Sequence, residues 1–445
     1  MSSQTLQHTA PSPTVALHPF IDLLTEARAR TLLLIGRLEE PELRRQHDRL
    51  MSPILWDLGH IAAFEELLLI DNSAGKIEFF EMPGMYNPFE HPRATRDALP
   101  LPSLGQLMAG MAEGRRRVLD RLATARLDWT SPLLRDGYLF RMVAQHEYQH
   151  GETILQTLKL KQGTPYAPPR MAAPPPGAPI EADTDGMVLF PGGAVQIGTA
   201  DRSAAYDNER GPHTVTLPAF RIDAAPVTNG AYLQFMNAGG YRERKLWSDA
   251  GWEWLQESAV EAPKYWESTG AGWKVRDFDR LEEVDPTHPV CHICFHEAEA
   301  FARWAGKRLP TEEEWEAAAS WDPATGEKRL YPWGDESPTA LHANLDQLTF
   351  STAPAGAYGL NRSPIGCYGM IGDVWEWTSS HFTGYPGFES FPYREYSEAF
   401  FGSDYRVLRG GSWATRPGAV RNTLRNWDYP IRRQIYSGFR CALDA

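Results

Sequence analysis

The residues with the clearest chemical potential are two histidines in the run His146-Glu147-Tyr148-Gln149-His150. The apolar residues around this run recur at intervals of three and four, which predicts an α-helix. Four residues turn a helix by about 400°, so both imidazoles project from one face, about 6 Å apart along its axis. Two imidazoles at this spacing are typical of a metal site.

The same letters match H-E-x-x-H, the signature of zinc proteases. Such a protease needs a third ligand, either a Glu on a second helix about two dozen residues later or a His in the pattern H-x-x-G-x-x-H. Neither follows His150: the next acidic residue after Glu152 is Glu181, beyond a proline-rich tract. A zinc hydrolase is therefore the weaker interpretation.

A third imidazole is available upstream. His60 lies on the apolar side of a second predicted amphipathic helix, which runs from Trp56 to Glu66. One His on this helix and two on a distant one would form a three-imidazole site inside a helical bundle. Taken alone, His60 could instead be a histidine packed in the core.

Composition describes an ordinary globular chain of 445 residues, 42% of them hydrophobic. A formal net charge of −13 argues against a nucleic-acid or anionic-membrane partner. The first residues have no basic start followed by an apolar run, and no long apolar stretch occurs, so we expect a cytoplasmic protein. The sequence does not indicate an oligomeric state.

Cys291 and Cys294 form a C-x-x-C without a second pair, so we interpret them as small, partly buried residues.

Proline enrichment divides the chain. We predict a helical region at 15–163, a semi-extended linker at 164–183 and a second domain at 184–445. Helix-like runs occur at roughly 18–39, 41–71, 103–125 and 135–162, enough for a four-helix bundle. After the linker the sequence is rich in Gly, Trp and Tyr, which indicates aromatic side chains buried between irregular loops.

The second domain resembles the formylglycine-generating-enzyme fold, which is C-type-lectin-like. Six motifs occur in the order found in that family: Val188-Leu189-Phe190-Pro191-Gly192-Gly193, Pro226-Val227-Thr228-Asn229, Arg308-Leu309-Pro310-Thr311-Glu312-Glu313-Glu314-Trp315, Tyr331-Pro332-Trp333-Gly334, Gly372-Asp373-Val374-Trp375-Glu376-Trp377 and Arg409-Gly410-Gly411-Ser412-Trp413. The sulfatase-modifying members use a pair of late cysteines, but here Cys441 stands alone and Cys367 lies far upstream. The resemblance therefore implies the fold and not formylglycine formation.

Together with a DinB-like bundle that carries the histidines, the whole chain resembles the sulfoxide synthases of ergothioneine biosynthesis. The expected fold class is α+β, a DinB-like four-helix bundle followed by an irregular, loop-rich formylglycine-generating-enzyme-like domain. The resemblance implies a non-haem iron(II) bound by His60, His146 and His150, with O2 as co-substrate, that joins a thiol sulfur to the imidazole C2 of hercynine. Three neutral imidazoles would leave three positions on iron for a thiolate, an imidazole and dioxygen.

The resemblance also implies roles for residues outside the histidine cluster. Tyr393 matches the family's catalytic tyrosine, with Tyr396 as the alternative, and both could otherwise belong to an aromatic loop core. Hercynine would contact Gln149, Asn426 and Trp427, whose ring suits a trimethylammonium group. The sulfur donor, γ-glutamylcysteine or cysteine, would be held by the following three residues: Arg93, Arg96 and Asp428.

Two other interpretations stay open. The related selenoneine synthases would share the iron site and the hercynine pocket, but would join a selenosugar to hercynine by a C–Se bond. Alternatively, the chain could be a non-catalytic binding module, because the second fold also serves as a scaffold for ligand display. The presence of all three histidines together with Tyr393 argues against the second interpretation.

Overall fold

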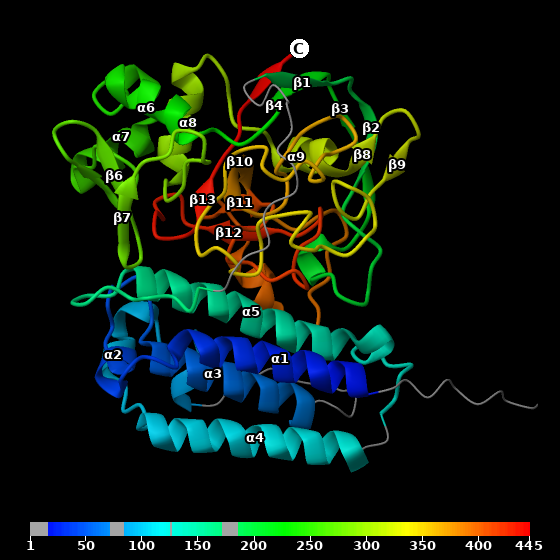
Figure 1. Cartoon of the computed structure of the whole chain (residues 1–445). Helices are drawn as coiled ribbons and strands as arrows, with labels where there is room; N and C mark the ends of the chain where they lie inside the picture. Colours follow the sequence, from blue (N-terminus) through cyan, green and yellow to red (C-terminus); the bar gives the residue numbers. More distant parts are fainter. Residues whose placement is uncertain (1–16, 72–83, 125–126, 171–185) are drawn as a thin grey trace, which may run out of the picture.

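The computed structural model describes residues 17–71, 84–124, 127–170 and 186–445. A helical bundle is followed by a region of short strands, loops and further helices (Figure 1). The predicted α+β class, with a four-helix bundle and an irregular second domain, is confirmed. The start of the bundle at residue 15 and most of the 164–183 linker lie outside the described residues, so the domain boundaries stay a prediction.

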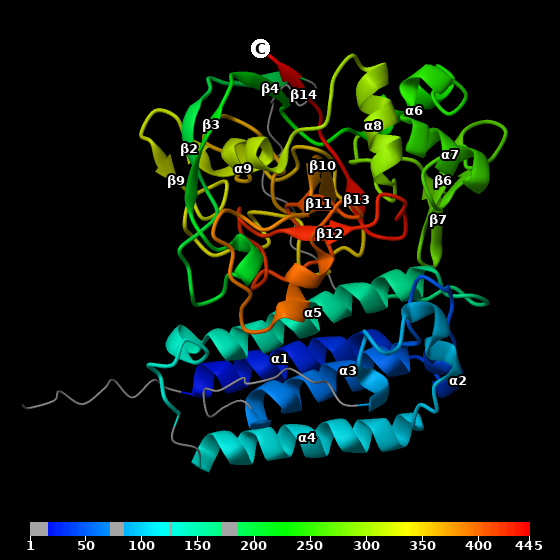
Figure 2. The same cartoon turned by 180° about the vertical axis from the view of Figure 1, so that it is seen from behind.

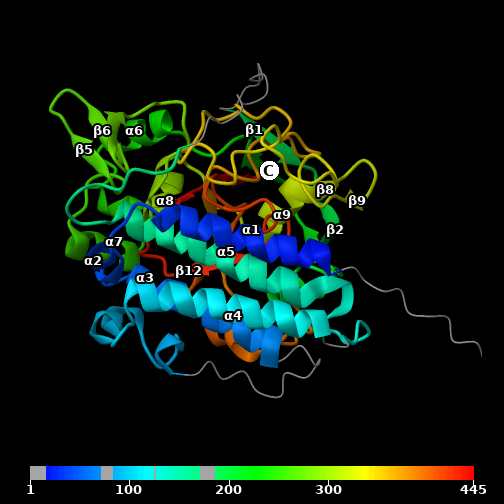
Figure 3. The ribbon, with the colours of Figure 1, turned by 60° about the horizontal axis from the view of Figure 1, so that its bottom comes forward.

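Four long helices build the bundle, and they run side by side when viewed from its outer face (Figure 3). In α4 the buried residues Leu107, Met111, Val118 and Leu122 recur at helical spacing, so one stripe faces the bundle interior. The long helices are α1 (His18–Ile35), α3 (Ile54–Glu66), α4 (Leu104–Thr124) and α5 (Tyr138–Lys159). Shorter turns connect them: α2 (Glu40–Arg44), the π-helical η1 (Leu67–Asp71), and the 3-10 turns η2 (Gly84–Tyr86), η3 (Arg93–Ala98) and η4 (Arg135–Gly137).

The predicted continuous helix over 41–71 is wrong. Helix α2 ends at Arg44 and α3 begins only at Ile54. Pro53, with φ −55° and ψ 138°, stands immediately before α3. Proline has no amide hydrogen and disfavours helical geometry in the residue before it, so it separates two helices that the apolar pattern alone joins. The intervening segment brings Leu50 to the junction with the second domain.

The second domain contains several small sheets in place of one large one. A four-stranded sheet has the order β12 (Asn426–Asp428), β11 (Arg406–Arg409), β10 (Trp375–His381), β13 (Ser437–Gly438). A three-stranded sheet has the order β1 (Met187–Phe190), β4 (Phe220–Asp223), β14 (Ala442–Asp444), with Ala442 opposite Ile222. The remaining strands are β2 (Gly193–Ile197) with β3 (His213–Leu217), β5 (Trp266–Ser268) with β6 (Trp273–Asp277) and β7 (Arg280–Glu283), and β8 (Trp321–Asp322) with β9 (Glu327–Lys328). The helices are α6 (Asn229–Asn237), α7 (Asp249–Ser258), α8 (Phe295–Trp304) and α9 (Glu312–Ser320), with 3-10 turns η5 (Asp207–Glu209), η6 (Arg244–Leu246), η7 (Arg394–Tyr396) and η8 (Glu398–Phe400).

Within the bundle, α5 lies next to the second domain, whereas α4 lies on the far side (Figures 1 and 2). Leu155 and Leu158 of α5 belong to the same buried apolar cluster as Trp413 and Tyr436 of the second domain. The two regions therefore share a continuous core along α5. Among the described residues, no helix has the length and apolar character needed to cross a membrane.

Candidate metal centre and active site

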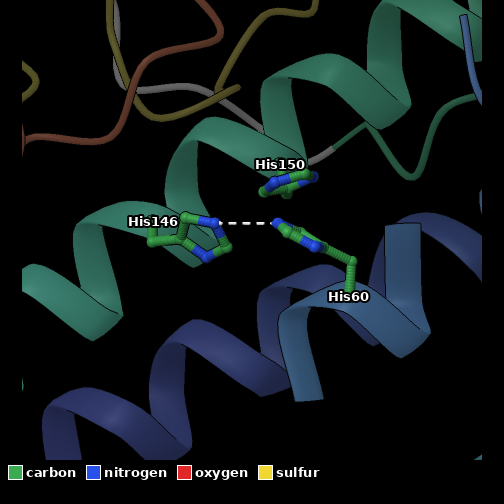
Figure 4. Close-up of side chains that lie close together, drawn as sticks. All are labelled: His60, His146 and His150. Atoms are coloured by element: carbon green, nitrogen blue, oxygen red, sulfur yellow. Dashed lines mark hydrogen bonds between the residues drawn. The ribbon is translucent and has the colours of Figure 1, made fainter. Parts of the chain in front are cut away.

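Helices α3 and α5 bring the three predicted histidines together. His60 projects from α3, and His146 and His150 project from α5 (Figure 4). The Nε2 atoms of His60 and His146 are 3.2 Å apart, and one ring nitrogen from each of the three residues lies within 4.8 Å of the others. Two nitrogens bound at right angles, each about 2 Å from one ion, would be about 3 Å apart. The three nitrogens could therefore bind one metal ion from the same side and leave its other side open.

Groups behind the rings fix their orientation. The Nδ1 atom of His60 is 2.9 Å from the carbonyl oxygen of Tyr86, and Nδ1 of His150 is 3.2 Å from Oδ1 of Asp57. The ring of His146 stacks on Phe64, with centroids 3.6 Å apart. Because Nδ1 is engaged in His60 and His150, the Nε2 atom of each is the free ligand. Asp57 was missed in the sequence, although it precedes His60 by three residues on the same helix.

Burial gives the cluster its charge state. Burial, together with the neighbouring His150, lowers the pKa of His60 and of His146 well below the usual value. Both rings are therefore neutral near pH 7, with a lone pair available for a cation. Neutral nitrogen ligands suit a divalent transition metal such as iron or zinc.

The Glu of the H-E-x-x-H run faces away from any such metal. Oε1 of Glu147 accepts a hydrogen bond from Nε of Arg28 at 2.8 Å, and Nη2 of Arg28 also donates to Glu65 at 2.8 Å. Glu147 is 1% exposed. An ion pair in the bundle core therefore holds the residue that a zinc protease would use as its general base. The geometry argues against the zinc-hydrolase alternative.

Both predicted tyrosines come from the second domain and contact residues that neighbour the histidine cluster. Gln149, exposed on α5 between the two histidines, donates from Nε2 to the Tyr396 hydroxyl at 3.2 Å. Tyr393 lies edge-on to Phe64, the ring that stacks on His146, with centroids 6.3 Å apart. Burial raises the pKa of both phenols well above the usual value, so both stay protonated near pH 7.

The predicted hercynine contacts follow on the edge strand β12. Trp427 stacks on Phe382 at 4.0 Å and meets Tyr396 edge-on at 6.2 Å. Asn426 directly precedes Trp427, and its Oδ1 accepts the Trp427 backbone amide at 2.9 Å. Gln149, Tyr396 and Trp427 thus form a continuous wall from α5 to β12.

The two predicted donor-binding arginines lie in different environments. Arg93 is exposed at the domain junction, where Leu50 contributes a carbonyl that accepts from Arg93 at 3.5 Å and from Arg432 at 3.1 Å. Nε of Arg432 lies 3.1 Å from Oδ1 of Asp428. Arg93, Asp428 and Arg432 therefore surround one position at the junction. Arg432 was missed, although its place four residues after Asp428 is typical of a local ion pair.

Arg96, by contrast, is buried. It donates to the His91 carbonyl at 2.8 Å and to the Ser52 hydroxyl at 2.6 Å. Its guanidinium lies 3.5 Å above the centre of the Trp56 ring, and Trp56 stacks in turn on His60 at 4.9 Å. Burial lowers the pKa of Arg96 to about 10, so it remains charged at neutral pH. Arg96 and Trp56 thus form a stack that ends on a predicted metal ligand.

The two cysteines of the C-x-x-C sequence lie close to the start of α8. Cys294 is buried and Cys291 half-buried at the start of α8, and burial raises the pKa of both thiols. Their thiols are protonated near pH 7, which disfavours metal binding or nucleophilic chemistry.

Comparison with known proteins extends over both regions. Residues 174–445 match the sulfatase-modifying factor enzyme 1-like domain, and residues 23–154 match the DinB superfamily. A protein of Mycolicibacterium thermoresistibile named hercynine oxygenase is 47% identical over 428 residues, which cover 95% of this chain and 94% of that one. A protein of the same name from Mycobacterium tuberculosis is 46% identical over 424 residues, which cover 95% of this chain and 97% of that one. The formylglycine-generating enzyme of Thermomonospora curvata is 34% identical over 288 residues, 58% of this chain and 93% of that one.

Proposed function

The chain belongs to the ergothioneine-biosynthesis sulfoxide synthase family, which joins a DinB-like bundle to a sulfatase-modifying-factor-like domain, and we propose that it couples a thiol to hercynine with iron(II) and O2. The proposed donor is γ-glutamylcysteine or cysteine, and the bond forms between its sulfur and C2 of the hercynine imidazole. The C2–H and S–H bonds break and the C–S and S–O bonds form. One oxygen atom of O2 enters the sulfoxide and the other leaves as water, so atoms and electrons balance.

The observation that carries the proposal is the cluster of three imidazoles beside a wall of second-domain residues. His60, His146 and His150 would hold iron(II), which would bind the thiolate and activate dioxygen, the oxidant of the coupling. The protein's own part is to orient both substrates and to manage protons. Tyr393, protonated because of burial, would exchange a proton at its phenol oxygen near the coupling centre, with Tyr396 as the alternative.

Hercynine would occupy the space beside Gln149, Asn426 and Trp427. The amide side chains offer hydrogen bonds to the imidazole and carboxylate. The face of an indole attracts a quaternary ammonium group, which the trimethylated amine of hercynine carries. The relatives named hercynine oxygenase support this substrate and give no support to the selenosugar alternative.

The thiol donor would bind at the junction, where charges of both signs meet. We propose that Arg93 and Arg432 hold a carboxylate and that Asp428 holds the ammonium group of a γ-glutamyl or cysteinyl donor. Nε and Nη1 of Arg96 already donate hydrogen bonds within the bundle, so Arg96 would contribute its positive charge to this site. A donor with an amino-acid group fits this pattern better than an uncharged one.

The decisive experiment uses the full chain loaded with iron under anaerobic conditions. O2 consumption is measured with hercynine and each of a panel of thiols and selenols, and the product is identified by mass spectrometry. We expect oxygen uptake that requires both hercynine and γ-glutamylcysteine or cysteine, with a sulfoxide as product. Uptake without any hercynine-derived product, or a much faster reaction with a selenosugar, would contradict the proposal.

A further inference from the structure

Helix α5 has a second functional face besides the one that carries its histidines. Its residues 145, 149, 152 and 159 fall within about 80° of one another on a helical projection, and His146 and His150 lie about a third of a turn away. Each of the four side chains contacts the second domain. Gln145 donates to the Ala204 carbonyl at 3.0 Å, and Lys159 pairs with Asp277 at 2.8 Å. The metal-bearing helix thus rests on the substrate-bearing domain through a polar stripe.

Glu152 accepts three hydrogen bonds from the second domain. Its Oε1 accepts hydrogen bonds from Nε1 of Trp375 at 2.7 Å and from the Ser412 hydroxyl at 3.1 Å. Its Oε2 accepts from the Thr415 hydroxyl at 2.9 Å. The residue is 7% exposed, and within the described residues no Arg or Lys pairs with its carboxylate. The second domain thus surrounds this carboxylate with neutral donors on both oxygens.

Two of the three donors to Glu152 come from motifs that are typical of the second domain's fold. Trp375 belongs to Gly372-Asp373-Val374-Trp375 at the start of β10, and Ser412 belongs to Arg409-Gly410-Gly411-Ser412 after β11. Strand β11 pairs with β12, which carries Asn426 and Trp427. Trp375, the first residue of β10, therefore lies in the sheet that presents the proposed hercynine contacts, and Ser412 follows β11 of the same sheet.

We infer that Glu152 is a positioning residue: it fixes the rotation and height of α5 on the second domain so that the histidine cluster and Gln149 meet Tyr396 and Trp427. The inference rests on the proposed function for its kinetic consequence only. Glu152 follows His150 by two residues, whereas Lys159 follows it by nine, about 14 Å along the axis. Both side chains cross the same junction, but only Glu152 lies beside the site.

The test compares Glu152→Ala and Glu152→Gln with Lys159→Met as the matched control, all in the full chain. Fe(II) affinity is measured by anaerobic titration, kcat and KM by oxygen uptake, and backbone mobility by hydrogen exchange. Glu152→Ala should keep Fe(II) affinity within threefold, because all three histidines belong to the bundle. It should lower kcat at least tenfold and speed exchange in peptides that contain Gln149 and Tyr396.

The other two variants separate positioning from general stabilisation. Glu152→Gln should restore kcat to within threefold of the native value. The amide oxygen can still accept from Trp375 and Ser412, and the NH2 group can donate to the Thr415 hydroxyl. Lys159→Met should lower the melting temperature and speed exchange around Asp277, yet keep kcat within threefold.

Three results would overturn the inference. These are unchanged kcat and exchange in Glu152→Ala, equal losses of kcat in Glu152→Ala and Lys159→Met, or loss of Fe(II) binding in Glu152→Ala. If the native chain turned over no hercynine, the proposed function would fail, but the exchange comparison would still decide the role of Glu152. Faster exchange at Gln149 and Tyr396 in Glu152→Ala alone would then support it, and identical exchange in all variants would refute it.

Discussion

The bundle and the second domain position their functional residues by different means. In the bundle, helix geometry places His146 and His150 on one face, and a single ion-pair group around Arg28 joins α1, α3 and α5. In the second domain the strands are short, and buried arginine–glutamate pairs connect segments that are far apart in the sequence. These pairs are Arg409–Glu316, Arg421–Glu209, Arg425–Glu312 and Arg440–Glu376. Local periodicity thus predicts the first kind of site, and only the tertiary structure reveals the second.

The largest effect should come from the bundle's own cluster. His146→Ala removes one of three ligands, so we expect turnover to disappear. Loss of a residue that only orients a ligand costs up to about 100-fold in metal affinity, so loss of the ligand itself should lower Fe(II) affinity by more than that. The control is His47→Ala, another buried histidine of the same region, which contacts the Glu42 carbonyl and the Gln162 amide and not the cluster. Metal analysis gives the iron content of both variants, and oxygen uptake gives their turnover. Equal metal content in the two variants would remove the metal site from the proposal.

Replacement of the two tyrosines tests what the second domain adds. Tyr393→Phe should retain iron and lower kcat by about 10² to 10⁴, the range expected for loss of a proton donor. Tyr396→Phe loses a hydrogen bond with Gln149, worth about 1 kcal/mol, and should slow turnover only about fivefold. Steady-state oxygen uptake at saturating substrate gives both values. The reverse order would identify Tyr396 as the proton donor.

Breaking a buried pair tests the stabilisation of the second domain. Arg440→Met leaves Glu376 without the partner that contacts it at 2.7 and 2.8 Å, and should destabilise the domain by about 3 to 5 kcal/mol. Arg116→Ala, at an exposed pair with Glu113, should leave the unfolding midpoint almost unchanged, because solvent screens the pair. Urea unfolding, followed by tryptophan fluorescence, measures the stability of both variants. Similar midpoints for both variants would contradict the contrast drawn between the two regions.

The smallest expected effect concerns the junction, where both regions contribute. Arg93→Ala should raise the KM of the thiol donor by the equivalent of about 1.5 to 3 kcal/mol and leave the KM of hercynine nearly unchanged. Arg96→Ala should in addition weaken Fe(II) binding, because the stack of Arg96 and Trp56 on His60 is lost. Steady-state kinetics with each substrate varied, and metal titration, separate these outcomes. Full activity of the double variant would exclude an anionic donor at this position.

The sequence predicts the bundle features well because they are local. A spacing of four residues on a helix places His146 and His150 together, and an amphipathic pattern places His60 on an inward face. Domain resemblance supplied the second fold and the tyrosine region. Contacts between distant segments leave no local pattern: Glu152 and Trp375 are separated by 223 residues. The same reason explains why the burial of Arg96 emerged only from the structure, whereas Arg432 lies four residues after Asp428 and could have been found from the sequence.

The pairing of β14 with β4 has a consequence for the order in which the protein forms during synthesis. Strand β4 ends at Asp223, but its partner begins only at Ala442. A chain emerging from the ribosome completes α5 at Lys159 long before this sheet can close. The three histidines can therefore assemble while the face that later covers α5 is still unfinished. For that interval the nascent chain presents Leu155 and Leu158 beside the polar stripe of α5, and an unpaired edge of β4, to the ribosome surface and to chaperones.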